Sequence, residues 1–145
     1  MDSSKYAVNW LQTARDDYNF ARNTYGQITS PNDYKYICFH CQQAAEKAIK
    51  AVFLLDHLTK DMQYSHDLSI LLTEYISGQF IPDDMEDELL ANADKLTPYE
   101  TQTRYPAGNG KYIIDPSNFN CAEALKAAKF ILDWAENEIE KHGKE

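Results

Sequence analysis

Residues Tyr36–Phe53 read YICFHCQQAAEKAIKAVF, a segment apolar enough to be the central helix of a protein core. At about 100° per residue, the polar side chains of such a helix fall on one stripe. They are Tyr36, His40, Gln43, Lys47 and Lys50, with Glu46 at the edge of the stripe. Apolar and small residues cover most of the remaining circumference. The segment therefore predicts a helix that is buried nearly all round, apart from one polar seam.

The polar seam has more than one interpretation. Its side chains can face water while the lysine stems cover apolar neighbours. They can also form a cleft wall that binds an anion, because the His40 imidazole and the Lys47 and Lys50 ammonium groups are hydrogen-bond donors. A third interpretation places the seam at a dimer interface. Spacing alone leaves these alternatives open.

Four other segments carry apolar residues at three- and four-residue steps, which is typical of amphipathic helices. With the central helix, the predicted helices cover about residues 4–25, 30–55, 68–77, 83–96 and 120–139. Residues that typically begin helices precede three of them: Ser30-Pro31, Ser65-His66-Asp67, and, before the last helix, Asp115, Asn118 or Asn120. Segment 97–118, TPYETQTRYPAGNGKYIIDPSN, carries prolines and glycines and predicts a loop. No convincing strand pattern is present. We therefore expect an all-α chain with one domain over residues 1–145, folded as an up-and-down bundle of four to five helices.

Composition narrows the classes of function. The net charge of −9 disfavours diffuse binding to a phosphate backbone, which depends on many cationic contacts, but it is compatible with a local basic pocket. The N-terminal segment has no apolar run of signal-peptide length, and no run approaches the length of a membrane span. The three cysteines are odd in number, so we expect a cytoplasmic protein with reduced thiols.

Motifs of common enzymes and metal sites are absent from the sequence. It contains no P-loop, no GxGxxG fingerprint and no nucleophilic triad. Cys38, His40 and Cys41 are close in sequence but point in different directions on a helix, whereas a structural zinc site needs four convergent ligands. We therefore expect neither a metal nor a cofactor.

Arg104 lies in the predicted loop, within Tyr99-Glu-Thr-Gln-Thr-Arg-Tyr-Pro106. Between aromatic residues, and with prolines restricting the backbone, it can act as a bidentate anion clamp. Pairing with a local carboxylate such as Glu100 is the alternative. Other polar residues are interpreted structurally: His66 as part of a capping turn, and Asp16, Asp17 and the run DDMEDE as solvated helix faces and a helix start.

Four segments, in order along the chain, resemble the HEPN family (higher eukaryotes and prokaryotes nucleotide-binding domain). They are WLQTARDDYNFA, CFHCQQAAEKAIKA, SHDLSILL and TRYP, and the alanine-rich final helix also fits. The resemblance implies a four- or five-helix bundle that usually forms a homodimer and binds nucleotide or RNA in a cleft between helices. It also implies an association with a small nucleotidyltransferase, in a toxin–antitoxin or related two-component system.

The resemblance also assigns site residues by position. The family's polar residues of the second helix match His40, Gln43, Glu46, Lys47 and Lys50, and its basic motif matches Arg104 with Tyr105 and Pro106. On this basis His40, Lys47, Lys50 and Arg104 are expected to contact phosphate, Gln43 and Tyr105 to contact base or sugar or to hold the site, and Glu46, Tyr36, Tyr99 and His66 to support it.

One departure from the family concerns catalysis. Many members that cut RNA without metal carry Arg, four to six residues, then His, whereas Asn109, Gly110 and Lys111 stand at the His positions here. The missing general acid–base partner argues against ribonuclease activity. The sequence therefore predicts a nucleotide-binding, dimeric partner of a small nucleotidyltransferase. A divergent metal-independent ribonuclease and a non-catalytic dimeric interaction module are the alternatives.

Overall fold

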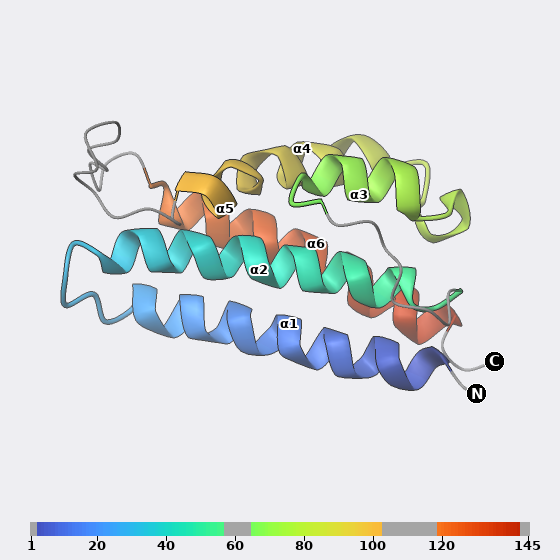
Figure 1. Cartoon of the computed structure of the whole chain (residues 1–145), viewed down its shortest axis with the longest axis horizontal. Coiled ribbons are helices and arrows are strands. Elements are labelled where there is room, and N and C mark those ends of the chain that lie inside the picture. The colour runs from blue at the N-terminus through green and yellow to red at the C-terminus, as the bar shows by residue number, and fades with distance from the viewer. Residues whose placement is uncertain (1–2, 57–64, 103–118, 143–145) are drawn as a thin grey trace.

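The computed structural model describes residues 3–56, 65–102 and 119–142, and every regular element within these ranges is helical (Figure 1). The elements are α1 (Ser3–Tyr25), α2 (Asp33–Phe53), α3 (Leu68–Tyr75), the 3₁₀ turn η1 (Gly78–Phe80), α4 (Glu86–Leu96), the single-turn helix α5 (Pro98–Gln102) and α6 (Cys121–His142). The prediction of an all-α bundle is therefore confirmed.

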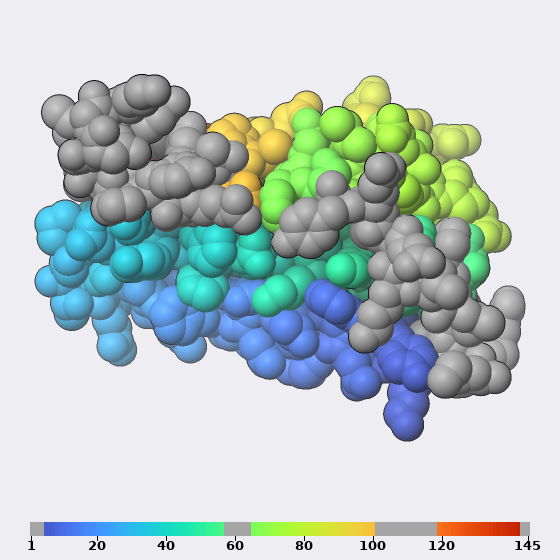
Figure 2. Space-filling view, viewed as in Figure 1, coloured from blue at the N-terminus to red at the C-terminus, as the bar shows by residue number. Residues whose placement is uncertain are grey.

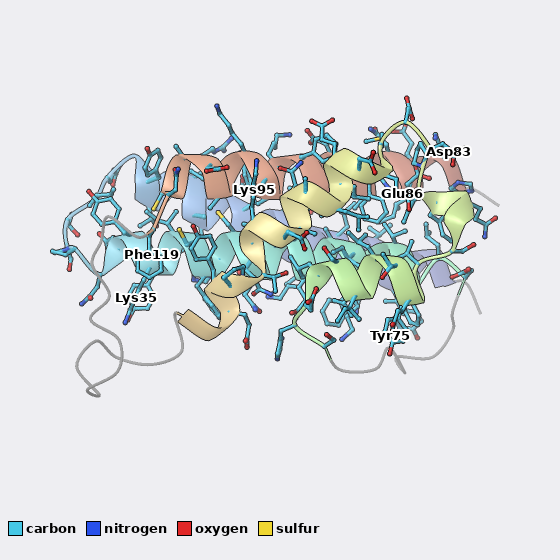
Figure 3. All side chains as sticks on the ribbon, turned by 90° about the horizontal axis from the view of Figure 1, so that it is seen from above. Lys35, Tyr75, Asp83, Glu86, Lys95 and Phe119 are labelled. Carbon is cyan, nitrogen blue, oxygen red and sulfur yellow. The ribbon has the colours of Figure 1, made fainter. Side chains whose placement is uncertain are left out.

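The helices α1, α2, α4 and α6 alternate in direction, as in an up-and-down bundle (Figure 1). Helix α1 packs along α2, α6 contacts both of them, and α4 contacts α6. The short α3 lies between α2 and α4 in the chain and runs antiparallel to α4, so the backbone N–H of Leu68 at its start reaches Thr97 Oγ1 at the end of α4 (3.1 Å). Seen from above, α4 crosses the bundle, and Asp83 and Phe119 lie toward opposite ends of it (Figure 3).

Two of the predicted helix starts are capped by side chains. Asp67 accepts a hydrogen bond from the backbone N–H of Ile70 (3.2 Å) and caps α3. Before α6, Asn120 Oδ1 accepts from the backbone N–H of Glu123 (3.0 Å), and Asn120 Nδ2 donates to Glu123 Oε2 (3.1 Å). The predicted pairing of Asn120 with Glu123 is thus confirmed, although the return contact is made by side chains and not by the backbone of Asn120.

Three sequence-based boundaries differ from the structure. Helix α2 begins at Asp33 and not at Ser30, because the Asp33 carboxylate accepts hydrogen bonds from the backbone N–H groups of Thr29 and Ser30 (2.9 and 3.2 Å) and holds the preceding turn. Helix α4 begins at Glu86 and not at Asp83, since the backbone first makes a separate turn from Pro82 to Met85 (2.9 Å). The loop prediction is wrong for residues 98–102, where a proline in the first turn is compatible with α5.

Alanine lines the contacts between α1, α2 and α6. Small buried side chains on these helices allow their axes to approach closely; they include Ala7, Ala14, Ala21, Ala45, Ala48, Ala124, Ala128 and Ala135. Larger side chains are buried on α3, α4 and α6, and Trp134 of α6 is 1% exposed. Its indole Nε1–H donates to the Phe80 carbonyl (2.8 Å), so η1 is tied to the core by a buried hydrogen bond.

In the space-filling view α1 and α2 lie side by side along one edge of the molecule (Figure 2). Toward α6, Arg15 Nε of α1 donates to Glu136 Oε1 at 2.7 Å. None of the described helices has both the length and the apolar character that a membrane crossing requires. Helix α2 contacts both α1 and α5, so its polar seam lies between these two helices.

Candidate functional site

The first part of the candidate site lies between α1 and α2, and we call Asp17, His40 and Lys47 the Asp17 cluster. Lys47 Nζ donates to Asp17 Oδ2 at 2.6 Å, and His40 Nδ1 lies 3.0 Å from Asp17 Oδ1. The side chains are only 15% (Asp17), 25% (Lys47) and 28% (His40) exposed. One carboxylate on α1 thus joins two donors that stand two turns apart on α2.

The ionisation of Asp17 follows from these contacts. Burial raises the pKa of this carboxyl, but the hydrogen bonds from His40 and Lys47 outweigh burial and hold the pKa below its ordinary value of 3.8. At neutral pH Asp17 is therefore a carboxylate. Because a carboxylate only accepts hydrogen bonds, His40 carries a proton on Nδ1.

Aromatic rings flank the Asp17 cluster on both sides along the pair of helices. The Phe20 ring lies 4.5 Å from the His40 ring, centroid to centroid, and is half exposed. At the other end Lys50 Nζ lies over the Trp10 ring, 4.6 Å from its centroid. In the described ranges no carboxylate pairs with the Lys50 ammonium, which therefore keeps donors for other partners.

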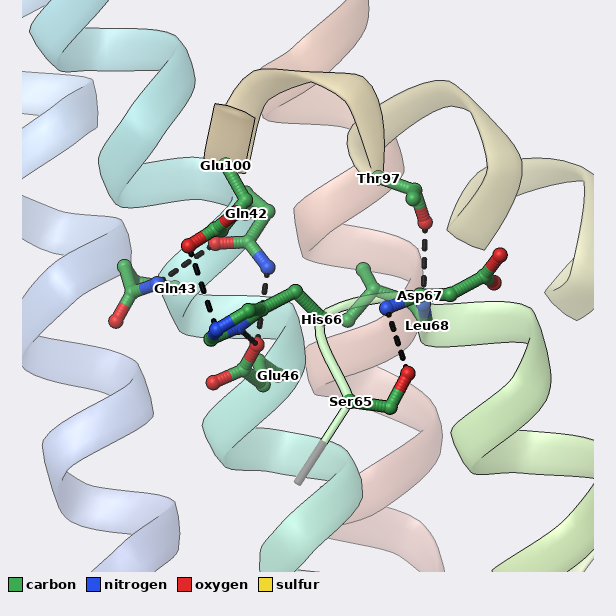
Figure 4. A network of polar contacts seen from close by, with 9 residues as sticks. All are labelled: Gln42, Gln43, Glu46, Ser65, His66, Asp67, Leu68, Thr97 and Glu100. Carbon is green, nitrogen blue, oxygen red and sulfur yellow. Dashed lines mark hydrogen bonds and ion pairs between the residues drawn. The ribbon is translucent and has the colours of Figure 1, made fainter. Parts of the chain in front are cut away.

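The second part lies on the other side of the seam, where His66 stands between two carboxylates (Figure 4). His66 Nδ1 lies 3.0 Å from Glu46 Oε1 of α2, and His66 Nε2 lies 3.4 Å from Glu100 Oε1 of α5. Glu100 is buried at 5% exposed. A neutral imidazole has only one N–H. The two contacts are therefore satisfied together when the ring carries both protons or when one glutamate is protonated.

Two glutamine side chains extend this network. Gln42, which is fully buried, donates through Nε2 to Glu46 Oε1 (3.1 Å) and accepts from Gln43 Nε2 (2.7 Å). We call Gln42, Gln43, Glu46, His66 and Glu100 the His66 cluster. It connects α2, the residue before the cap of α3, and α5 through hydrogen bonds and ion pairs.

The structure divides the predicted seam between these two groups. His40 and Lys47 turn toward α1, whereas Gln43 and Glu46 belong to the His66 cluster. Lys50 lies apart on Trp10. Two supporting residues are placed elsewhere: Tyr36 is exposed beside Lys35, and Tyr99 packs on Phe119. Arg104 and Tyr105 lie outside the described residues, and so does the loop that contains them.

Sequence reasoning missed three members of these clusters. The interpretation of Asp17 as a solvated residue is wrong, since its carboxylate is 15% exposed and paired twice. Its position could have shown this, because Asp17 stands three residues after Ala14 and four before Ala21, on the buried stripe of α1. Gln42 precedes Glu46 by four residues and could have been found in the same way. Nothing in the sequence indicates that Glu100 faces His66.

Tyr99 of α5 contributes a partly buried phenol near the end of the bundle. Burial raises the pKa of the Tyr99 phenol to about 12, so this hydroxyl remains protonated at neutral pH. Tyr99 precedes Glu100, and the Tyr99 ring lies 5.8 Å from that of Phe119. Helix α5 is therefore held near the start of α6 by Tyr99 and is linked to Glu46 of α2 by Glu100 through His66.

Comparisons with known proteins give a family model and a curated relative. The model of the HEPN domain matches residues 7–139. A protein of Methanocaldococcus jannaschii named "Putative toxin MJ1304" is 26% identical over 147 residues, which cover 96% of this chain and 92% of that protein.

Two solved structures share the fold. The crystal structure of TT1696 from Thermus thermophilus is 28% identical with a TM-score of 0.66, and the match covers 95% of this chain and 99% of that one. ST0689, described as an archaeal HEPN homologue, is 27% identical with a TM-score of 0.65 over 92% of this chain and 97% of its own. The four-segment resemblance noted in the sequence is thus confirmed. Because the family model spans nearly the whole chain, this protein belongs to the HEPN domain family.

Proposed function

We propose that this chain is a toxin-like HEPN protein that binds a nucleotide-type ligand along the edge formed by α1 and α2. The observation that carries the proposal is the order of side chains along this edge: Phe20 against His40, then Asp17 with Lys47, then Trp10 under Lys50. At about 1.5 Å per residue, Trp10 and Phe20 stand roughly 15 Å apart on α1. The aromatic rings can stack on bases, and the donors between them suit phosphate oxygens.

The charges of this edge support an anionic ligand in spite of the acidic chain. Asp17 offers one negative charge to two donors of α2, and Lys50 has no carboxylate partner among the described residues. A phosphate group that approaches Lys50 would therefore meet an unpaired ammonium beside an aromatic ring. The overall charge of −9 limits such binding to this local surface and disfavours extended backbone binding.

The experiment is a titration with ATP and with a short single-stranded RNA, read by calorimetry and by the thermal midpoint. A ligand that binds the folded state raises the midpoint as its concentration increases. Lys50→Met should weaken binding about tenfold, the loss of one charge-assisted contact of roughly 1.4 kcal/mol. Lys35→Met is the matched control, because Lys35 also lies over an aromatic ring on α2, 5.1 Å from the Tyr36 centroid. Absence of heat and of a midpoint shift at millimolar nucleotide would overturn the proposal.

The partner and the oligomeric state are part of the same proposal. The family resemblance implies a homodimer that associates with a small nucleotidyltransferase, and the relative named as a toxin supports a toxin-like role. Sedimentation of the purified chain tests the dimer. Co-purification with a nucleotidyltransferase encoded beside it tests the partner, and release of growth inhibition by that partner tests the toxin-like role. Sedimentation as a monomer at all concentrations would contradict the proposed homodimer.

A metal-independent ribonuclease is the second candidate, and His66 is the observation that favours it. A histidine whose two ring nitrogens contact carboxylates can hold a proton and pass it on. Cleavage of single-stranded RNA in the presence of EDTA, lost in His66→Gln and kept in His142→Gln, would support this function. A wild-type protein that cleaves no RNA would contradict the ribonuclease function and favour the binding function. A protein that neither cleaves RNA nor binds nucleotide would favour an interaction module.

A further inference from the structure

Two buried thiols meet at the junction of α2 and α6. Cys38 Sγ of α2 lies 3.8 Å from Cys121 Sγ, which belongs to the first residue of α6. Cys38 is fully buried and Cys121 is 3% exposed. The third cysteine, Cys41, stands one turn further along α2 and is also buried without a bond to another sulfur. The pair comes from positions 83 residues apart, so only the tertiary fold brings it together.

The hydrogen bonds of the pair give its two sulfur atoms different roles. Cys121 Sγ donates to the Tyr34 carbonyl (3.4 Å), and because a thiol has one proton, Cys38 is then the donor in the contact between the two sulfur atoms. The hydrogen bond from Cys38 lowers the pKa of Cys121 more than burial raises it. The pKa of Cys38 is raised by the same hydrogen bond and by burial, and burial raises that of Cys41. Cys121 is therefore the thiol of the three that ionises first.

We propose that Cys38 and Cys121 form a redox-controlled disulfide that cross-links α2 to the start of α6. A disulfide needs the two sulfur atoms at about 2.05 Å, so the atoms must close from 3.8 Å by side-chain rotation within the junction. The position of Cys121 in the first turn of α6 favours access, because terminal helical turns open more readily than helix centres. Cys41 is the competing partner on α2.

A hydroperoxide serves as the oxidant in this reaction. The Cys121 thiolate attacks the terminal oxygen, the O–O bond breaks, and an alcohol or water leaves with one proton while Cys121 becomes a sulfenic acid. The Cys38 sulfur then attacks the Cys121 sulfur, the S–O bond breaks, and water leaves as the disulfide forms. Two thiols are oxidised, one hydroperoxide is reduced, and no other co-reactant is needed.

The cross-link would act on the stability of the bundle and not on the binding edge. It joins residues separated by 83 positions, and disulfides that close long segments restrict the unfolded chain most. The Asp17 cluster lies between α1 and α2, whereas Cys38 and Cys121 lie at the contact of α2 with α6. The inference therefore does not depend on the proposed nucleotide site.

The experiment treats the folded wild-type protein with hydrogen peroxide and then alkylates the remaining thiols before mass analysis. We expect a mass lower by two hydrogens, one alkylated thiol at Cys41, a cross-linked peptide that contains Cys38 and Cys121, and a thermal midpoint raised by several degrees that dithiothreitol restores. Cys41→Ala should still form the cross-link, whereas Cys121→Ala should not.

Three results would overturn the proposal. They are a cross-link through Cys41, over-oxidation of Cys121 with Cys38 still alkylated, and three free thiols after peroxide treatment of protein that remains folded. Peptide mapping of the oxidised wild-type protein identifies the cross-linked cysteines even if an alanine variant does not fold.

Discussion

Lys47 Nζ of α2 lies 2.6 Å from Asp17 Oδ2 of α1, and both side chains are mostly buried, at 25% and 15% exposed. A charge pair at this depth stabilises the fold only in one arrangement of the two helices, because a shift of either helix would leave a buried charge without its partner. The contact therefore fits the observed packing of α1 on α2, in which His40 and Lys50 lie beside the aromatic rings of α1.

Replacing the carboxylate tests this relationship. Asp17→Asn removes the negative charge that Lys47 and His40 share and replaces one of the two acceptor oxygens by an NH₂ group, and we expect the free energy of unfolding to fall by about 1–3 kcal/mol. Urea denaturation measures the change. Asp16→Asn is the control, because Asp16 is exposed and should change the free energy by less than about 0.5 kcal/mol. Equal effects of the two substitutions would contradict a structural role for the cluster.

The same carboxylate predicts a pH dependence. The pKa of Asp17 is depressed in the folded state, so its contribution to stability is complete above the ordinary value of 3.8 and is lost as pH falls through the lower, folded value. The difference in free energy of unfolding between wild type and Asp17→Asn should therefore be constant near neutral pH and shrink below about pH 4. If the difference in free energy of unfolding between the two proteins grew as the pH is lowered, the pKa of Asp17 would not be depressed in the folded state.

His66 is predicted to hold α5 and the start of α3 against α2. In His66→Gln the carboxylates of Glu46 and Glu100 lose the group between them, and we expect a loss of about 1–3 kcal/mol in the free energy of unfolding. A second substitution, Glu100→Gln, removes one of the charges and should cost less in the His66→Gln background than in wild type. The double-mutant cycle measures this coupling. Simple additivity would show that His66 and Glu100 do not interact.

The hydrogen bond between α6 and η1 gives a test of the core. Trp134→Phe removes the indole N–H and leaves the buried Phe80 carbonyl without its donor, so we expect the free energy of unfolding to fall by about 1–3 kcal/mol. Trp10→Phe, at a half-buried position of α1, should cost less than about 1 kcal/mol because a ring remains under Lys50. Thermal denaturation of both variants checks that Trp134→Phe destabilises the protein more than Trp10→Phe does.

Local signals in the sequence account for most of the fold. The apolar periodicity of α2 and α6, the Asp67 cap and the pairing of Asn120 with Glu123 are properties of neighbouring residues, and the structure contains them as predicted. The boundary errors before α2 and α4 arise where a turn precedes the helix, since turn and helix start use the same residue types. Helix α5 was missed because a proline both interrupts a helix and begins one.

The sequence by itself determined an all-helical chain, the polar seam on α2 and the family, because the 3.6-residue period and the capping residues are local. Only the tertiary structure decided the partners of that seam. Asp17 meets Lys47, Glu100 meets His66 and Cys121 meets Cys38 across long stretches of chain. Such contacts depend on how one helix is shifted and rotated against the next, and this arises from packing of the whole core, which no single segment encodes.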